Sequence, residues 1–312
     1  MFIARKMLAL ALVLAVAPAC SLRTIAINSV ADTLAESGDT FASDGDPELI
    51  RAAVPFSLKL VEALLSEVPE HRGLLLAACS GFTQYAYAFV DSDAEMSRLE
   101  DYTRHARLQE RARRMYLRGR DYCLRSFELA HPGITEAFLQ DPDRAVAKLQ
   151  KKDVPLMYWT GTSWGKAVAL SLDRPAIAGD FPIVQALIRK ALALDESFGR
   201  GALHEVMITL ASLPEDMGGN RDRARHHYER ALELAKGCAA GPHVTYAMNV
   251  LRPQQKRQEF VTLLQTALDV DVDREPSLRL ANILASQYAE YLLNHLDELF
   301  LSEQEPNDGS RN

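Results

Sequence analysis

A recurring helical pattern constrains the fold of this 312-residue chain more than any other feature of its sequence. In each of five segments, a large or apolar residue is followed three positions later by a small residue and then at once by another apolar residue. The segments are Leu60/Ala63/Leu64, Cys123/Ser126/Phe127, Ile188/Ala191/Leu192, Tyr228/Ala231/Leu232 and Leu264/Ala267/Leu268. Positions three and four apart share one helix face, and a small residue there lets a neighbouring helix approach closely. The pattern therefore predicts amphipathic helices packed against one another.

The spacing of these segments indicates a repeat architecture. Ala191, Ala231 and Ala267 are separated by about 40 and about 36 positions, close to the ~34-residue period of tetratricopeptide repeats. Second helical patterns follow three of the segments, at 74–90, 201–210 and 278–293. Strand signals are scarce, with Val154–Trp159 as a short candidate. We expect an all-α, tetratricopeptide-like helix-pair solenoid, compacted by extra helices in the longer intervals.

The N-terminus has the layout of a secretory signal. Arg5 and Lys6 form a short basic region, and 7–17 is an apolar stretch too short to span a bilayer as a mature helix. The run Ala17-Pro18-Ala19-Cys20 allows either ordinary cleavage after an A-x-A site or lipidation of Cys20, and the small residue before the cysteine favours lipidation.

These features predict three regions: a signal peptide (1–19), an all-helical domain (20–300) and a disordered acidic tail (301–312). The mature protein is expected in the periplasm, held at a membrane through a lipid on Cys20. Ser21, standing where an aspartate could follow the cysteine, favours the inner leaflet of the outer membrane.

The charge distribution argues against nucleic acid as a partner. The net charge is -7, and phosphate contacts need clustered lysine and arginine. The arginine-rich segment 104–125 carries interleaved acids such as Glu110 and Asp121, which is typical of a solvated helix face.

Three cysteines follow Cys20, an odd number for an oxidising compartment. Cys79 ends the apolar run 74–79, so we expect it to be a buried free thiol in a helix. A disulfide between Cys79 and Cys123 is the alternative.

Both tryptophans lie in the tryptophan run, residues 158–166 (YWTGTSWGK). Its centre fits G-x-S-x-G, the strand-to-helix elbow that exposes a nucleophilic serine, here Ser163. No series of strands precedes it to build the sheet and oxyanion loop that such an elbow needs. A phosphate loop is excluded because three residues separate Gly161 from Gly165 where the Walker pattern has four. We predict no catalytic residue and a packed corner between helical repeats.

The metal-ligand residue types do not form a chelating set. His226 and His227 are adjacent on a predicted helix, so they point about 100° apart and lack the i, i+4 spacing of a zinc helix. The alternating aspartates at 269–273 begin like a calcium loop, but Arg274 stands where that loop needs glycine. His204 lies in an apolar stretch typical of a hydrogen-bonded core histidine. We expect no metal and no cofactor.

Several stretches together carry a family resemblance. They are the mature start 20–28 (CSLRTIAIN), the tryptophan run, 183–195 (IVQALIRKALALD) and 223–234 (RARHHYERALEL). These stretches resemble the T component associated with tripartite ATP-independent periplasmic (TRAP) transporters, over nearly the whole mature chain. The resemblance implies an all-helical periplasmic lipoprotein that partners a solute-binding protein and forms a homotrimer with a ligand-conducting channel.

Membrane-tethered helical arrays present concave surfaces, and an aromatic-rich segment can line an apolar cavity. The candidates for ligand contacts are Tyr158, Trp159, Trp164, Ser163 and Lys166. The three aromatic residues would line the cavity, and the serine and lysine would supply polar contacts. In the alternative interpretation both tryptophans only fill the core, and the run's glycines permit close backbone approach. A generic envelope scaffold and a serine hydrolase are the competing functions.

Overall fold

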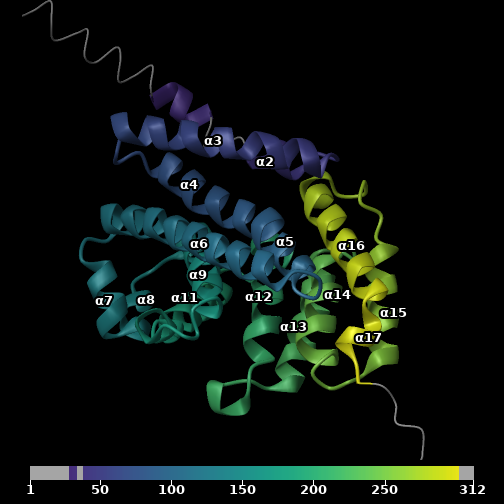
Figure 1. Cartoon of the computed structure of the whole chain (residues 1–312). Helices are drawn as coiled ribbons and strands as arrows, with labels where there is room; N and C mark the ends of the chain where they lie inside the picture. Colours follow the sequence, from purple (N-terminus) through teal and green to yellow (C-terminus); the bar gives the residue numbers. More distant parts are fainter. Residues whose placement is uncertain (1–27, 34–37, 302–312) are drawn as a thin grey trace, which may run out of the picture.

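The computed structural model describes residues 28–33 and 38–301 of the chain (Figure 1). Across these residues the regular secondary structure is helical and contains no strand, which confirms the all-α class. The predicted signal peptide (1–19), Cys20 and the predicted acidic tail beyond Leu301 lie outside the described residues.

The α-helices after the helical segment 28–33 are α2 (Gly38–Ala42), α3 (Pro47–Glu67), α4 (Arg72–Tyr85), α5 (Ser92–Ser97), α6 (Tyr102–Ala130), α7 (Ile134–Gln140), α8 (Pro142–Ala147), α9 (Val154–Ala169), α10 (Pro175–Ala178), α11 (Phe181–Leu194), α12 (Ala202–Ala211), α13 (Arg221–Leu234), α14 (Gly241–Tyr246), α15 (Arg257–Leu268), α16 (Arg279–Asn294) and α17 (Leu296–Leu299). Two π-helical turns, η1 (Ala86–Asp91) and η5 (Ala247–Leu251), extend α4 and α14.

Side-chain caps fix where several long helices begin. Asp46 accepts hydrogen bonds from the first backbone N–H groups of α3, Asp101 does so for α6, and Asn220 for α13. Each cap satisfies a donor that has no partner inside the helix and contributes about 1 kcal/mol. The caps therefore set helix starts that the apolar periodicity alone leaves uncertain.

The helices pack on one another largely in chain order (Figure 1). Contacts run from α3 to α4, α6, α9, α11 and α12 in turn, and α12 then contacts α13 and α14. Next, α14 packs on α15 and α16, and α16 returns against α2, α3 and α5. The series of helix contacts is therefore closed into a ring, whereas the predicted tetratricopeptide-like solenoid stays a prediction.

The closing contact joins residues far apart in the sequence. Arg279 at the start of α16 donates from Nη1 to the carbonyl oxygen of Ser43, 3.0 Å away. Leu280 and Leu284 of the same helix pack against the apolar cluster built by α3 and α4. Polar and apolar contacts thus both hold the C-terminal helices against the N-terminal ones.

The predicted small residues lie at helix contacts in four of the five segments. Ser126, Ala191, Ala231 and Ala267 are all buried. The prediction is wrong for the first segment, because Ala63 is exposed on α3. The buried face of α3 instead contains Leu58, Val61 and Leu65, so it lies beside the face that the pattern predicted.

Residues Arg72–Ser97 form one continuous helical stretch through α4, η1 and α5. By length and composition alone this stretch could cross a membrane. In the structure its apolar side chains pack against α3 and α6 as a core helix. Burial between two neighbouring helices is sufficient to explain its composition.

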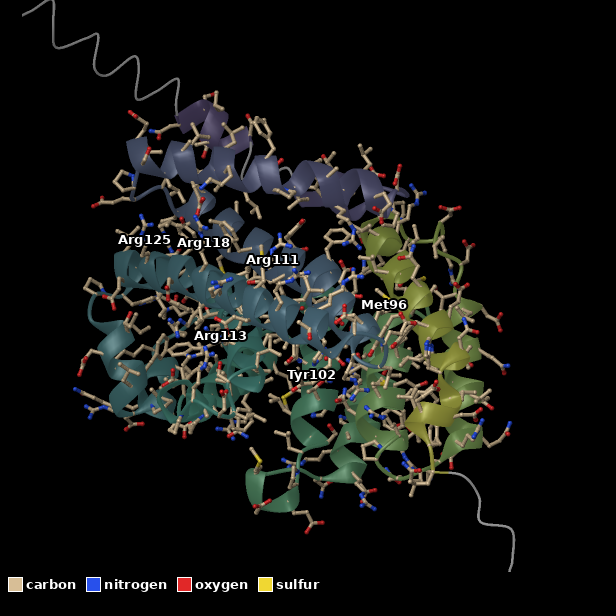
Figure 2. All side chains as sticks on the ribbon, viewed as in Figure 1. Met96, Tyr102, Arg111, Arg113, Arg118 and Arg125 are labelled. Atoms are coloured by element: carbon tan, nitrogen blue, oxygen red, sulfur yellow. A yellow bond between two sulfur atoms is a disulfide. The ribbon has the colours of Figure 1, made fainter. Side chains whose placement is uncertain are left out.

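The arginine-rich helix α6 is a solvated face tied down by ion pairs, as predicted. Figure 2 shows its labelled arginines spread along the helix. Arg113 Nε donates to Glu110 at 2.9 Å, and Arg118 pairs with Glu62 of α3 while covering the ring of Phe82. Arg125 donates to the carbonyl oxygen of Pro69. The partners of these arginines are therefore acids, an aromatic ring and a carbonyl oxygen of the same protein.

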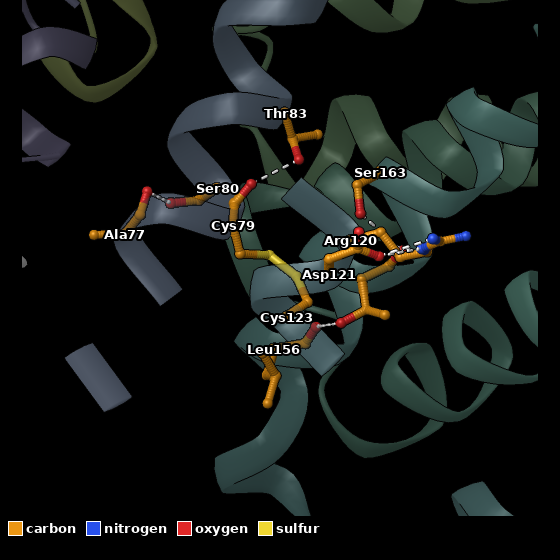
Figure 3. Close-up of a disulfide and its surroundings, with 10 residues drawn as sticks. Ala77, Cys79, Ser80, Thr83, Arg120, Asp121, Cys123, Leu156 and Ser163 are labelled. Atoms are coloured by element: carbon orange, nitrogen blue, oxygen red, sulfur yellow. Dashed lines mark hydrogen bonds and ion pairs between the residues drawn. A yellow bond between two sulfur atoms is a disulfide. The ribbon is translucent and has the colours of Figure 1, made fainter. Parts of the chain in front are cut away.

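The expectation of a free thiol at Cys79 is wrong, and the alternative disulfide is present. Cys79 of α4 and Cys123 of α6 form a disulfide, with their Cα atoms 5.2 Å apart (Figure 3). Gly119, one turn before Cys123, lets the helices approach, since a Cβ there would lie 3.0 Å from the carbonyl oxygen of Cys79. Burial in a helix was correctly predicted, but sequence does not show which two helices meet. Cys238 is a buried free cysteine.

Candidate functional site

The tryptophan run lies in the middle of α9, not in a corner between repeats. Val154–Trp159 is the first part of this helix, so the short strand considered there is wrong. A six-residue apolar run has no periodicity that separates a strand from a buried helix. Gly161 and Gly165, four positions apart, lie on the face that meets α11. A Cβ on Gly161 would lie 2.6 Å from Ile188 Cδ1, and one on Gly165 would lie 3.1 Å from Val184 Cγ1.

Ser163 is enclosed in this helix packing. Its side chain is fully buried, and its hydroxyl donates to the carbonyl oxygen of Thr160 at 3.1 Å. A nucleophile elbow instead presents its serine on an exposed, strained turn after a strand. The serine-hydrolase interpretation therefore has no geometric support.

Trp164 and Lys166 have partners within the protein. The indole N–H of Trp164 donates to Asp180 at 2.9 Å, and the guanidinium of Arg120 lies 5.2 Å from the indole ring centroid. Lys166 Nζ lies 3.1 Å from Asp91 Oδ2 and 4.7 Å from the ring centroid of Tyr87. Both side chains thus tie α9 to its neighbours.

Tyr158 and Trp159, by contrast, are only half-buried. Their ring centroids are 4.8 Å apart, and the ring of Tyr158 also lies 5.2 Å from that of Phe198. These three rings form an aromatic cluster at the N-terminal half of α9. Of the five predicted contact residues, Lys166 and Tyr158 also interact with Tyr87 of η1.

Tyr87 of η1 combines solvent exposure with a strongly shifted pKa. The residue is 56% exposed, yet the protein around its phenol raises the pKa well above the ordinary value for tyrosine. A side chain in a concave surface is expected to combine these two properties, so we interpret the space beside Tyr87 as a hollow that solvent reaches.

Electrostatic effects link four side chains from separate helical elements, which we assign to this hollow: Tyr87 of η1, Tyr158 of α9, Glu205 of α12 and Tyr288 of α16. Burial is the main cause of the raised pKa of each tyrosine. The charge of Glu205 adds to the shifts of Tyr87 and Tyr158, and Tyr87 adds to that of Tyr288. Such couplings require the groups to be close together.

Glu205 is the acidic group of the hollow. Burial raises the pKa of its carboxyl, and a hydrogen bond from Thr245 of α14 opposes that rise. The Thr245 hydroxyl donates to Glu205 Oε1 at 2.9 Å. Gly241 makes room for the carboxylate, because a Cβ there would lie 2.7 Å from Oε1.

Sequence analysis missed Glu205, Tyr87 and Tyr288. The signal for Glu205 was an acid within the apolar stretch Ala202–Leu210, a stretch in which only His204 was considered. Half-exposed tyrosines on helices carry no comparable signal. Only the ring closure brings their helices together.

Histidines form a separate buried group next to the hollow. His204 and His227 share a hydrogen bond between their Nδ1 atoms at 2.9 Å, so one ring donates and the other accepts. Tyr228 is hydrogen-bonded to His243 at 2.9 Å. The predicted core role of His204 is confirmed. Within the described residues, 28–33 and 38–301, no group of three His, Cys, Asp or Glu side chains is placed to hold a metal ion.

Because these histidines are buried in the neutral form, we expect the folded protein to lose stability in acid. Burial lowers the pKa of His204, and it lowers the pKa of His227 and His243 to about 4, below the ~6.5 of an exposed histidine. The neutral rings stabilise the folded state fully above pH ~6.5, and that contribution is lost as the pH falls towards 4. We expect the urea midpoint of the wild type to fall as the pH is lowered over this window. The midpoint of His243→Gln should fall less steeply with pH than that of His226→Gln, a control at an exposed position. Equal slopes for the two variants would contradict the assignment.

Two comparisons with known proteins bear on the family. A protein of Treponema pallidum (strain Nichols), described as an uncharacterized protein, is 31% identical over 301 residues, covering 90% of this chain and 93% of its own. The family model described as TRAP transporter T-component matches residues 43–300. The chain belongs to the TRAP transporter T-component family. The match runs from just before α3 to the end of α17, so every helix that contributes a side chain to the hollow of this T component lies inside it.

Proposed function

We propose that this T component is a non-enzymatic, periplasmic accessory protein of a TRAP transport system. It binds the system's solute-binding protein and holds a small ligand in the hollow between η1, α9, α12 and α16. A lipid on Cys20 tethers it to the inner leaflet of the outer membrane, and the working assembly is a homotrimer. The helix pairs are derived from a tetratricopeptide-like solenoid.

The hollow supports this proposal most directly. A chain that served only as a scaffold would gain stability by filling its centre with apolar side chains. Here Glu205, Tyr158 and Tyr288 are half-buried and Tyr87 is exposed, so these polar side chains do not fill an apolar core. Enclosed sites with an apolar lining and a few convergent polar groups are typical of small-molecule binding.

The partner assignment is tested with purified proteins. The mature T component is mixed with the solute-binding protein encoded beside TRAP membrane subunits in the same genome. We expect a complex in size-exclusion chromatography with light scattering, and Ser163→Ala should form it equally well. The T component alone should have three times the protomer mass.

Two results would overturn the proposal. Failure to form a complex with any TRAP solute-binding protein of the same organism would favour a generic envelope scaffold. An esterase activity that is lost in Ser163→Ala would show an enzyme instead. Folding of the variant is checked by its helical circular dichroism.

A further inference from the structure

We propose that a groove between α13, α14 and α15 binds a small zwitterion: a solute that carries an ammonium group, a carboxylate and a short apolar side chain, as an amino acid does. The groove uses none of the residues assigned to the hollow. The inference therefore goes beyond the proposed function and does not depend on it.

The groove has a volume of about 400 Å³, within the range of small-molecule sites. It lies where the last turn of α13, the loop that follows, α14 and the end of α15 come together (Figure 1). Leu232 and Val270 give it an apolar wall. The alternating aspartates noted in the sequence, Asp269 and Asp271, line it as exposed side chains, and so does Arg274. The groove thus offers an apolar surface together with charges of both signs.

A buried histidine presents a free polar atom to this groove. His243 is 6% exposed and lines the groove. Its Nδ1 is hydrogen-bonded to the phenol of Tyr228 at 2.9 Å, and its Nε2 has no partner within the described residues. Nε2 is not among the unpartnered polar atoms that are sealed from solvent. It therefore faces the groove, where a ligand atom can reach it.

The bond to Tyr228 determines which nitrogen of His243 carries the proton. Burial raises the pKa of Tyr228 to about 12 and lowers the pKa of His243 to about 4, so both groups are neutral near pH 7. A phenol is a stronger hydrogen-bond donor than a neutral imidazole, so Tyr228 donates to Nδ1. Nε2 then carries the hydrogen, and it can donate to an oxygen atom of the ligand.

Arg274 is the cationic group of the groove, and it lacks a counter-charge. The acids next to it in the chain have other partners, because Asp273 pairs with Arg279 at 2.9 Å and Glu275 pairs with Arg200 at 2.8 Å. Across residues 28–33 and 38–301, no ion pair joins the guanidinium of Arg274 to an acid. A guanidinium binds a carboxylate through two parallel hydrogen bonds. Together with the imidazole donor, it suits the carboxylate of a ligand.

The acids of the groove suit an ammonium group. Asp269 is the C-cap of α15, at the negative end of the helix dipole, where a cation is normally favoured. The last turn of α13 also reaches the groove, through Leu232. Asp271 Oδ1 accepts the backbone N–H of Asp273 at 3.0 Å. In the part of the chain that the structure describes, neither Asp269 nor Asp271 forms an ion pair. A bound ammonium group would supply the missing cation.

The test compares three probes that share an isobutyl group: L-leucine, its methyl ester, which has no carboxylate, and 4-methylpentanoate, which has no ammonium group. Calorimetric titration of the full mature protein is run at about pH 6, where both amines are protonated. Leucine should bind about tenfold more tightly than either of the other probes, because each of them lacks one charge-assisted contact. Equal affinity for leucine and its ester, or no binding of leucine, would overturn the inference.

Two exposed charges locate the bound probe. Arg274→Gln should lower the affinity for leucine about tenfold, to that of the ester, and leave the ester unchanged. Asp269→Asn should weaken binding of leucine and the ester but not of 4-methylpentanoate. Arg221→Gln and Asp222→Asn are matched controls at the exposed start of α13, and they should change no affinity. Leucine binding that is unchanged in both groove variants would place leucine elsewhere and overturn the site.

The imidazole contact has its own test. His243→Phe keeps an aromatic ring at this position and removes the Nε2 donor. We expect it to weaken binding of leucine and 4-methylpentanoate and to leave binding of the ester unchanged. Helical circular dichroism checks its folding, and the two surface variants decide the question if the chain does not fold. Unchanged leucine binding by a folded His243→Phe would contradict the site.

Discussion

Replacing Gly161 by valine is expected to lower the free energy of unfolding by about 3 kcal/mol, the upper part of the range for overpacked cores. A single Cβ at this position would already lie 2.6 Å from Ile188 Cδ1 and 2.9 Å from Ile188 Cγ1. Ile188 is fully buried, so its side chain has no free space into which it can move. Urea denaturation followed by circular dichroism measures the effect.

Gly165→Ala is the matched control. A Cβ there would lie 3.1 Å from Val184 Cγ1, a contact that a shift of a few tenths of an ångström relieves. Alanine also gains about 1 kcal/mol of helix propensity over glycine. The two terms oppose each other, so we expect Gly165→Ala to be close to neutral and Gly161→Ala to destabilise. Equal effects at both positions would show that the α9–α11 contact does not depend on Gly161.

Removing the disulfide is expected to cost about 3–4 kcal/mol. Cys79 and Cys123 are separated by 44 positions, and for a loop of this length the entropy gained by the unfolded chain sets an upper value of about 4 kcal/mol. The double variant Cys79→Ala/Cys123→Ala should show the loss in urea denaturation. Reduced wild-type protein should approach the same midpoint, because it loses the same cross-link without the change in packing.

The remaining cysteine supplies the control for this experiment. Cys238→Ala removes a buried thiol that forms no disulfide, and its denaturation should respond to reductant as the wild type does. A reductant-insensitive wild type, or free-thiol titration of three cysteines in the mature oxidised domain, would contradict the cross-link.

Local patterns predicted the helices well, and non-local features failed for a physical reason. The small residues Ala191, Ala231 and Ala267 were correctly placed in helix contacts, because i, i+3 and i+4 spacing defines a face without reference to the rest of the chain. Ala63 followed the same local rule and is exposed, since the neighbours of α3 decide which face is buried. The pairing of Cys79 with Cys123 depends on the α4–α6 contact, which periodicity does not specify.

The candidate site shows the same difference between local and non-local features. The composition of the tryptophan run drew attention to it, but Ser163 and Trp164 of that run are buried where α9 packs against its neighbours. Glu205 was passed over because a single acid has no periodicity. It becomes a candidate only because its charge acts on the phenols of Tyr87 and Tyr158, which lie on other helical elements. Ring closure is the step that creates the site, and it joins residues that no sequence window contains together.

The return of α16 to α2 and α3 also bears on how the protein matures. An open repeat array gains stability one neighbour at a time, and its first helices can fold before its last ones exist. Here Arg279 is bonded to Ser43 across 236 positions, so the N-terminal helices of the described chain lack part of their contacts until the C-terminal ones arrive. The seam between α16 and the N-terminal helices is thus the latest element to assemble in a chain made from its N-terminus, and until then the inner faces of these helices are open to solvent.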